Sequence, residues 1–238
     1  MLQLFLLPFA GGNRFSYDFL IKKLKTNTSN IKCYPLELPG RGRRFGEKLA
    51  RDKKLAIDDY LHQLTKLRDK TPYIIYGHSM GATLGLSIIK RMEEKNDAPL
   101  QFIATGNAGP KIKEENEDKP STKKHLLNDE KFKKALRKLG GIPDEILENE
   151  ELYSFFSSIL RADFQILEEG GNADQSIIIN TPIYALMGDQ EKSVKHINNW
   201  QKFTNTSFKA QVLTGNHFFI HEHTETLTTI ILSTYKKA

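Results

Sequence analysis

One pentapeptide limits the folds open to this chain more than any other segment. The G-x-S-x-G spacing of a nucleophile elbow, with serine on a sharp strand-to-helix turn, occurs in Gly77-His78-Ser79-Met80-Gly81. Its flanking glycines let the strand and helix approach without Cβ clashes. The β-rich run Tyr73–Tyr76 comes directly before it, and apolar residues at helical spacing follow it, namely Leu84, Ile88, Ile89 and Met92. We therefore predict that Ser79 is a nucleophile rather than part of a plain glycine-rich turn.

Strand and helix patterns alternate along most of the chain, which favours an α/β fold with a mostly parallel sheet flanked by helices. The expected strands are Leu2–Leu7, Lys32–Leu36, Tyr73–Tyr76, Leu100–Thr105, Ile183–Met187 and Phe208–Leu213. Besides the helix after Ser79, the expected helices are Tyr17–Leu24, Ile57–Arg68, Val194–Phe203 and Thr224–Tyr235.

The alternation is interrupted between residues 108 and 174. A highly charged stretch, Lys111–Lys124, is typical of a mobile surface connection, and the segments Glu130–Leu139 and Glu145–Leu167 have helical periodicity. A long helical insertion within an α/β sheet is more typical of a lid over an active site than of a linker. We expect a single domain over residues 1–238, with residues 108–174 as a helical lid inserted within it.

A serine nucleophile needs a general base, and in this fold the chain order is serine, acid, histidine. His217 follows the strand Phe208–Leu213 and a short turn, so it lies where active groups of open α/β sheets gather. For the acid, Asp189 and Glu191 both follow Ile183–Met187, and either could orient the histidine.

A metal site is the alternative interpretation of the C-terminal histidines. His217, His221 and His223 could supply nitrogen ligands, but no acidic or cysteine pattern completes a site, so we expect no metal and no cofactor.

An oxyanion hole is the remaining requirement of this chemistry. The amide of Met80, at the start of the helix, would supply one donor. The loop after the first strand would supply the other, from Ala10 or, as the second choice, Phe9.

Composition limits the compartment and the partners. Cys33 is the only cysteine, so no intrachain disulfide can form, and a reducing cytoplasm is the expected location. The apolar start Leu2–Leu7 is too short to cross a membrane. The net charge of +6 comes from scattered lysines without an aromatic-interleaved basic stripe, so we expect neither a nucleic-acid partner nor a membrane partner.

Several segments together resemble the type II thioesterases, the free-standing editing enzymes of polyketide and nonribosomal peptide synthesis, which belong to the α/β-hydrolase superfamily. Phe9 stands where that family more often has histidine. The matching segments are the P-x-A-G-G-like loop Pro8–Gly12, the P-G-R-G-x-R loop Pro39–Arg44, the G-H-S-M-G-A elbow Gly77–Ala82, the lid motifs Leu139–Pro143 and Leu160–Phe164, and the G-x-H-F-F segment Gly215–Phe219.

This resemblance implies hydrolysis of acyl chains from the phosphopantetheine arm of acyl or peptidyl carrier domains, for editing or release. We expect the protein to be a monomer. The resemblance implies Ser79 as nucleophile and His217 as base, and it favours Glu191 as the acid, because Glu191 stands at the position of the family's aspartate. Carrier domains tend to be acidic, so Arg41, Arg43 and Arg44, with lysines of residues 111–138, are candidate docking residues. The alternatives are a general carboxylesterase and a non-catalytic carrier-binding homologue.

Overall fold

A single parallel sheet of six strands organises the described part of the chain. The computed structural model describes residues 1–112, 123–170 and 176–236. The strand order is β2-β1-β3-β4-β5-β6, and every neighbouring pair is parallel. The strands are β1 Leu2–Leu7, β2 Ile31–Pro35, β3 Tyr73–His78, β4 Gln101–Thr105, β5 Ile183–Gly188 and β6 Phe208–Leu213. The α/β prediction is confirmed, and the strand bounds differ from the expected ones by at most two residues.

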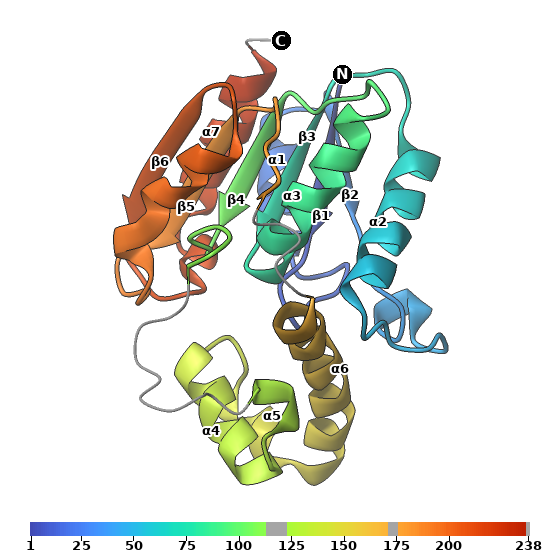
Figure 1. Cartoon of the computed structure of the whole chain (residues 1–238), viewed down its shortest axis with the longest axis vertical. Helices are drawn as coiled ribbons and strands as arrows, with labels where there is room; N and C mark the ends of the chain where they lie inside the picture. Colours follow the sequence, from blue (N-terminus) through green and yellow to red (C-terminus); the bar gives the residue numbers. More distant parts are fainter. Residues whose placement is uncertain (113–122, 171–175, 237–238) are drawn as a thin grey trace.

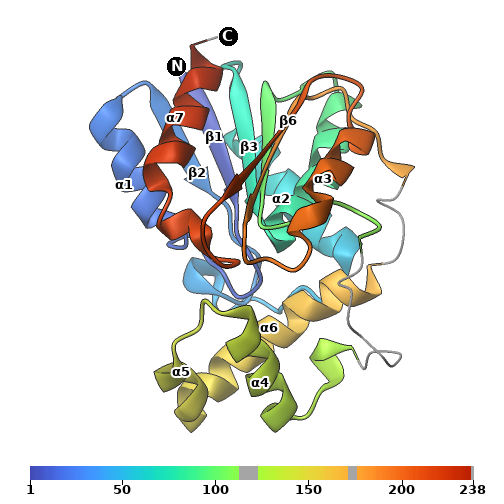
Figure 2. The ribbon, with the colours of Figure 1, turned by 90° about the vertical axis from the view of Figure 1, so that its left-hand side faces the viewer.

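Helices cover both faces of this sheet (Figures 1 and 2). The helices flanking the sheet are α1 Asp18–Asn27, α2 Lys53–Leu67, α3 Met80–Glu93 and α7 Thr224–Tyr235. Strand β1 is buried throughout, because its alternate side chains enter two different cores. Phe5 and Leu7 pack with α2 and α3, whereas Leu2, Leu4 and Leu6 pack with α1 and α7.

One predicted helix has a different geometry from the expected α-helix. The segment η4, Val194–Phe203, consists of 3₁₀ turns. Its buried apolar side chains Ile197, Trp200 and Phe203 recur every third residue. A 3₁₀ helix has three residues per turn, so this spacing places all three on one side, against the core.

Residues 123–170, the described part of the insertion (residues 108–174) that contains its helices, form a separate helical layer below the sheet in Figure 1. Its elements are η2 Lys124–Leu126, α4 Asp129–Leu139, α5 Asp144–Glu148 and α6 Glu150–Glu169. The single helix expected from residue 145 is broken at Asn149, whose side chain accepts a hydrogen bond from the Leu152 amide and caps α6. Most of the charged stretch predicted to be a mobile connection lies outside the described residues.

Within the described residues, the insertion has a small core of its own and a buried ionic link to the rest of the protein. Phe132, Leu136, Leu147, Tyr153, Leu160 and Phe164 form the core. The link joins Asp163 of α6 to Arg41, whose Nη1 and Nη2 donate to Oδ2 and Oδ1 at 2.6 and 2.7 Å. The side chains of Arg41 and Asp163 are 2% and 0% exposed. The Gly11 amide also donates to Asp163 Oδ2, at 2.7 Å. Burial disfavours the charged guanidinium, but the adjacent carboxylate outweighs it and raises the pKa of Arg41.

Replacing Asp163 by alanine is expected to lower the free energy of unfolding by about 3–5 kcal/mol, because it leaves the buried charge of Arg41 without its carboxylate. Urea unfolding at pH 7 measures the change. Asp144→Ala is the matched control, because it removes a largely exposed partner of Arg137 and should cost less than about 1 kcal/mol. Equal midpoints for Asp163→Ala and the unmodified protein would contradict this account.

No helix in the described part of the chain combines the length and the apolar character that crossing a bilayer requires.

Candidate active site

Ser79 occupies a strained turn between β3 and α3. Its φ is 53° and its ψ is −111°, a combination that residues other than glycine rarely adopt. A Cβ on Gly77 would lie 2.4 Å from the Gly81 carbonyl oxygen, and one on Gly81 would lie 2.0 Å from the Leu7 carbonyl oxygen. The Ser79 amide donates to the Thr105 carbonyl of β4 at 2.8 Å. The two glycines therefore permit the elbow, and β4 holds it.

His217 lies in the loop that follows β6, next to a carboxylate from the loop after β5. Its Nδ1 is 2.7 Å from Glu191 Oε2. The other oxygen of Glu191, Oε1, accepts from the Gly188 amide at 2.8 Å. A carboxylate only accepts hydrogen bonds, so Nδ1 carries the proton and Nε2 is the basic nitrogen of the neutral ring. The Glu191 and His217 side chains are only 6% and 15% exposed, so the interaction is shielded from water.

The two carboxylates that the sequence left open occupy different places. Asp189 is exposed, and its Oδ1 accepts from the Gly215 amide at 2.9 Å. Asp189 therefore supports the turn that leads to His217, whereas Glu191 contacts the imidazole itself.

A second histidine joins the elbow to the His217 loop. The ring of His78, the residue before Ser79, lies 5.0 Å from the ring of His217, measured between centroids. His78 is fully buried, and its Nδ1 is 2.9 Å from Thr105 Oγ1. A Cβ on Gly106 would lie 2.4 Å from this ring, so the glycine makes room for it. Burial, followed by the charges of His217 and His221, lowers the pKa of His78 well below its usual value, so the ring is neutral near pH 7.

Thr105 and Gly106 are site residues that sequence reasoning missed. Thr105 ends β4 and Gly106 follows it, and the end of a parallel strand beside the elbow is the signal that could have identified them.

The candidate oxyanion donors come from two adjoining segments. Met80 is the first residue of α3, where backbone amides have no partner within the helix. Phe9 and Ala10 follow β1, in a turn closed by a 2.8 Å bond from the Gly12 amide to the Phe9 carbonyl. The Phe9 ring packs on Phe218 and His78, with centroids 5.0 and 5.7 Å apart.

The insertion contacts both loops of the site. A Cβ on Gly141, between α4 and α5, would lie 2.2 Å from the ring of Phe218, the residue after His217. A Cβ on Gly11 would likewise lie 2.7 Å from Cδ2 of Leu160 in α6. The insertion therefore covers the edge of the sheet at which Ser79 and His217 lie.

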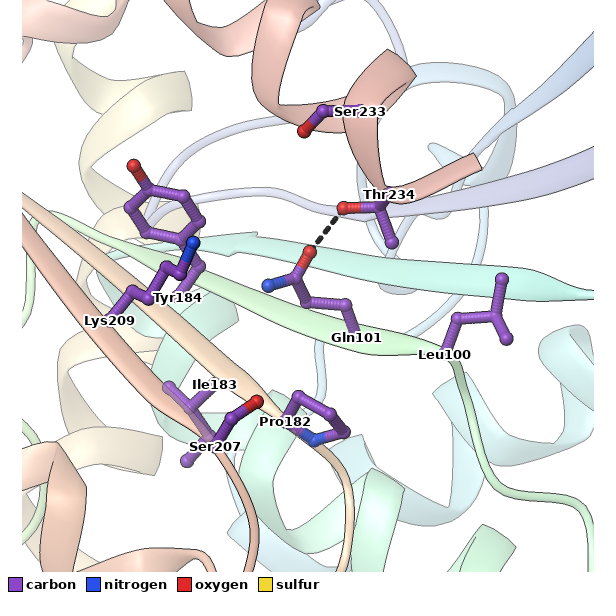
Figure 3. Close-up of a pocket in the computed structure, with 9 residues that line it drawn as sticks. All are labelled: Leu100, Gln101, Pro182, Ile183, Tyr184, Ser207, Lys209, Ser233 and Thr234. Carbon is purple, nitrogen blue, oxygen red and sulfur yellow. Dashed lines mark hydrogen bonds between the residues drawn. The ribbon is translucent and has the colours of Figure 1, made fainter. Parts of the chain in front are cut away.

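Figure 3 shows a pocket at the other edge of the sheet. Its volume is about 220 Å³, and its lining includes Gln101, Ile183 and Ser207, at or just before the starts of β4, β5 and β6. Ser79 and His217 follow the ends of their strands, so this pocket is not part of their site.

The sheet is parallel, and a serine elbow follows its central strand β3, an acid follows β5 and a histidine follows the last strand, β6. This arrangement defines the α/β-hydrolase class. The thioesterase domain model matches residues 2–237 of the chain. The chain therefore belongs to the thioesterase domain family, and it is a thioester hydrolase of the serine-hydrolase type.

Similar proteins come from biosynthetic systems. The chain is 32% identical to the linear gramicidin dehydrogenase LgrE of Brevibacillus parabrevis, over 97% of this chain and 86% of that protein. It is 27% identical to the gramicidin S biosynthesis protein GrsT of Aneurinibacillus migulanus, over 93% of this chain and 84% of that protein. The crystal structure of ClbQ from the colibactin NRPS/PKS pathway superposes with a TM-score of 0.86 at 25% identity, covering 99% of this chain and 97% of that chain.

Proposed function

We propose that this protein is a type II thioesterase that removes acyl groups from the phosphopantetheine arm of carrier domains in nonribosomal peptide or polyketide synthesis. The observation that carries the chemistry is the 2.7 Å contact between His217 Nδ1 and Glu191 Oε2, in a structure whose elbow is built around Ser79. The proposed role in nonribosomal peptide or polyketide synthesis is supported by the likeness to GrsT and ClbQ, whose names refer to gramicidin S and colibactin biosynthesis.

The proposed reaction is acyl transfer in two steps. Ser79 Oγ attacks the thioester carbonyl while His217 Nε2 takes its proton, and Glu191 stabilises the imidazolium. The amides of Met80 and Ala10, with Phe9 as the alternative to Ala10, stabilise the oxyanion. The proton then passes to the departing sulfur, and the carrier thiol leaves. Water attacks the acyl-serine, giving up its proton to Nε2, and the return of a proton to Ser79 releases the acid.

The same proposal makes the insertion a lid. Gly140 and Gly141 both have φ near +80°, so an alanine strains the backbone at either position. Only at Gly141 would the new Cβ overlap the Phe218 ring, since the nearest atom to a Cβ on Gly140 is 3.9 Å away.

Gly141→Ala is therefore expected to lift the lid turn from Phe218 and to speed the labelling of Ser79 by a bulky fluorophosphonate several-fold. Gly140→Ala is the matched control and should leave the labelling rate near that of the unmodified protein. The measurement is the pseudo-first-order labelling rate of each variant. Equal rates for the two variants would argue against the lid.

The experiment that tests the function compares two substrates with the same acyl group. One is an acyl thioester on a carrier domain, and the other is a simple oxoester. We expect a much larger kcat/KM for the carrier thioester. A preference for the oxoester would point to a carboxylesterase. Failure to hydrolyse either, together with no labelling of Ser79, would point to a non-catalytic homologue.

A further inference from the structure

Two aromatic side chains meet in solvent where the insertion joins the rest of the protein. Phe45, directly after the 3₁₀ turn η1 Gly42–Arg44, is 61% exposed, and Phe155 of α6 is 40% exposed. Their ring centroids are 5.3 Å apart. Leu152, three residues before Phe155 on α6 and therefore on the same side of the helix, is 44% exposed. Single exposed apolar residues are ordinary, but a contiguous aromatic cluster is typical of a binding surface.

This cluster lies close to the rim of the candidate site. Phe155 precedes Asp163 by eight residues on α6, which is about 12 Å along the helix axis. Asp163 in turn binds Arg41 and the Gly11 amide of the loop after β1. Arg41 was predicted to be a docking residue, but it is buried and therefore belongs to this internal link. The aromatic cluster is the outer side of the same junction.

Exposed cations flank the aromatic side chains. Arg43, Lys48 and Arg51 are all exposed in the segment around Phe45. On the insertion side, the exposed carboxylate of Glu151 lies one turn before Phe155.

The acidic residues within the Phe45 segment are engaged in local contacts. Glu47 is bound by Arg44, which also binds Asp59. Asp52 accepts from the Leu55 amide and caps α2. Residues 43–52 carry four basic side chains against two carboxylates, so positive charge predominates around Phe45 and the local field favours an acidic partner.

We propose that Phe45, Leu152 and Phe155, flanked by Arg43, Lys48 and Arg51, form the docking face for the carrier domain. This inference rests on the proposed function, which supplies an acidic partner that must place its arm at Ser79. The aromatic residues supply apolar contact area, and the cations steer and orient the carrier. Arg44, held by two carboxylates, shapes the segment rather than contacting the partner.

The test separates docking from chemistry by using two thioesters of one acyl group. The first is an acetyl group on the phosphopantetheine arm of a peptidyl carrier domain, and the second is acetyl-N-acetylcysteamine, which has no carrier. The double variant Phe45→Ser with Phe155→Ser is expected to lower kcat/KM for the carrier substrate at least about tenfold, as loss of more than about 1.4 kcal/mol of hot-spot contact implies. Activity on the small thioester should stay unchanged.

A charge-reversed variant gives an independent readout. Arg43→Glu with Lys48→Glu should weaken carrier binding and flatten its dependence on salt concentration, because screening acts on the steering charges. The matched control is Leu126→Ser, which removes a 65% exposed apolar side chain of the insertion outside this face and should change neither substrate's rate.

Titration calorimetry measures binding of the carrier to each variant in a Ser79→Ala background. This measurement distinguishes failure of the proposed function from failure of the proposed docking face. If the carrier binds through this face but its acyl group is not hydrolysed by the active enzyme, the proposed function fails and the docking face stands. If the carrier thioester is hydrolysed with unchanged kcat/KM and Kd in both variants, the docking face is wrong. If the protein with an intact face neither binds nor hydrolyses the carrier substrate, both are wrong.

Discussion

Replacing Ser79 by alanine is expected to lower kcat for acyl-thioester hydrolysis by as much as about 10⁶-fold, the size of loss seen when a serine protease loses its nucleophile. No other group in the proposed mechanism can form the acyl intermediate. The fold should persist, because alanine removes one oxygen atom and leaves the glycines of the elbow in place. The measurement is acid release from a carrier-bound thioester, with the urea midpoint as a check on folding.

The control for this prediction is Ser158→Ala, which removes an exposed hydroxyl from α6 and should leave the rate unchanged. Unmodified turnover in Ser79→Ala with a normal urea midpoint would rule out Ser79 as the nucleophile, whatever the fold.

Glu191→Gln is expected to have the second-largest effect, lowering kcat by up to about 10⁴-fold, the size of loss seen when the triad carboxylate of a serine protease becomes an amide. The Gly188 amide still has an oxygen to bind. The group beside His217 Nδ1, however, is then a neutral amide, which cannot stabilise the imidazolium. If the amide nitrogen faces Nδ1, it also cannot accept the Nδ1 proton, so the reactive tautomer is not held. Steady-state kinetics at pH 7 on the same thioester measure the loss.

Asp189→Asn is the matched variant, because it makes the same chemical change two residues away. Its oxygen can still accept from the Gly215 amide, so the turn should survive and the rate should change little. Similar activities in Glu191→Gln and Asp189→Asn would contradict the assignment of a single essential acid to Glu191.

The contrast between these carboxylates illustrates how far sequence reasoning reached. Both follow β5, and both are separated from His217 by more than 20 residues. Their positions along the chain therefore give no physical reason to prefer one of them as the acid. The resemblance favoured Glu191, and the register of the two loops decides which side chain reaches the imidazole. The role of Asp189 in the turn was not predicted at all.

Arg41 is the plainest correction. In the sequence it stands in a basic loop with Arg43 and Arg44, which made it a surface candidate. Its partner, Asp163, is 122 residues away, and only their meeting in space converts an exposed charge into a buried one. The family motifs contained both residues but no signal that joined them.

Local patterns alone determined the strands, the elbow at Ser79 and the helical character of the insertion, because periodic burial and the steric need for glycine act between near neighbours along the chain. Tertiary structure alone decided that Glu191 contacts His217, that Arg41 is buried with Asp163, and that Phe45 meets Phe155 on the surface. Such pairings depend on how distant loops are brought together when the sheet assembles, and that information is spread over the whole packed core.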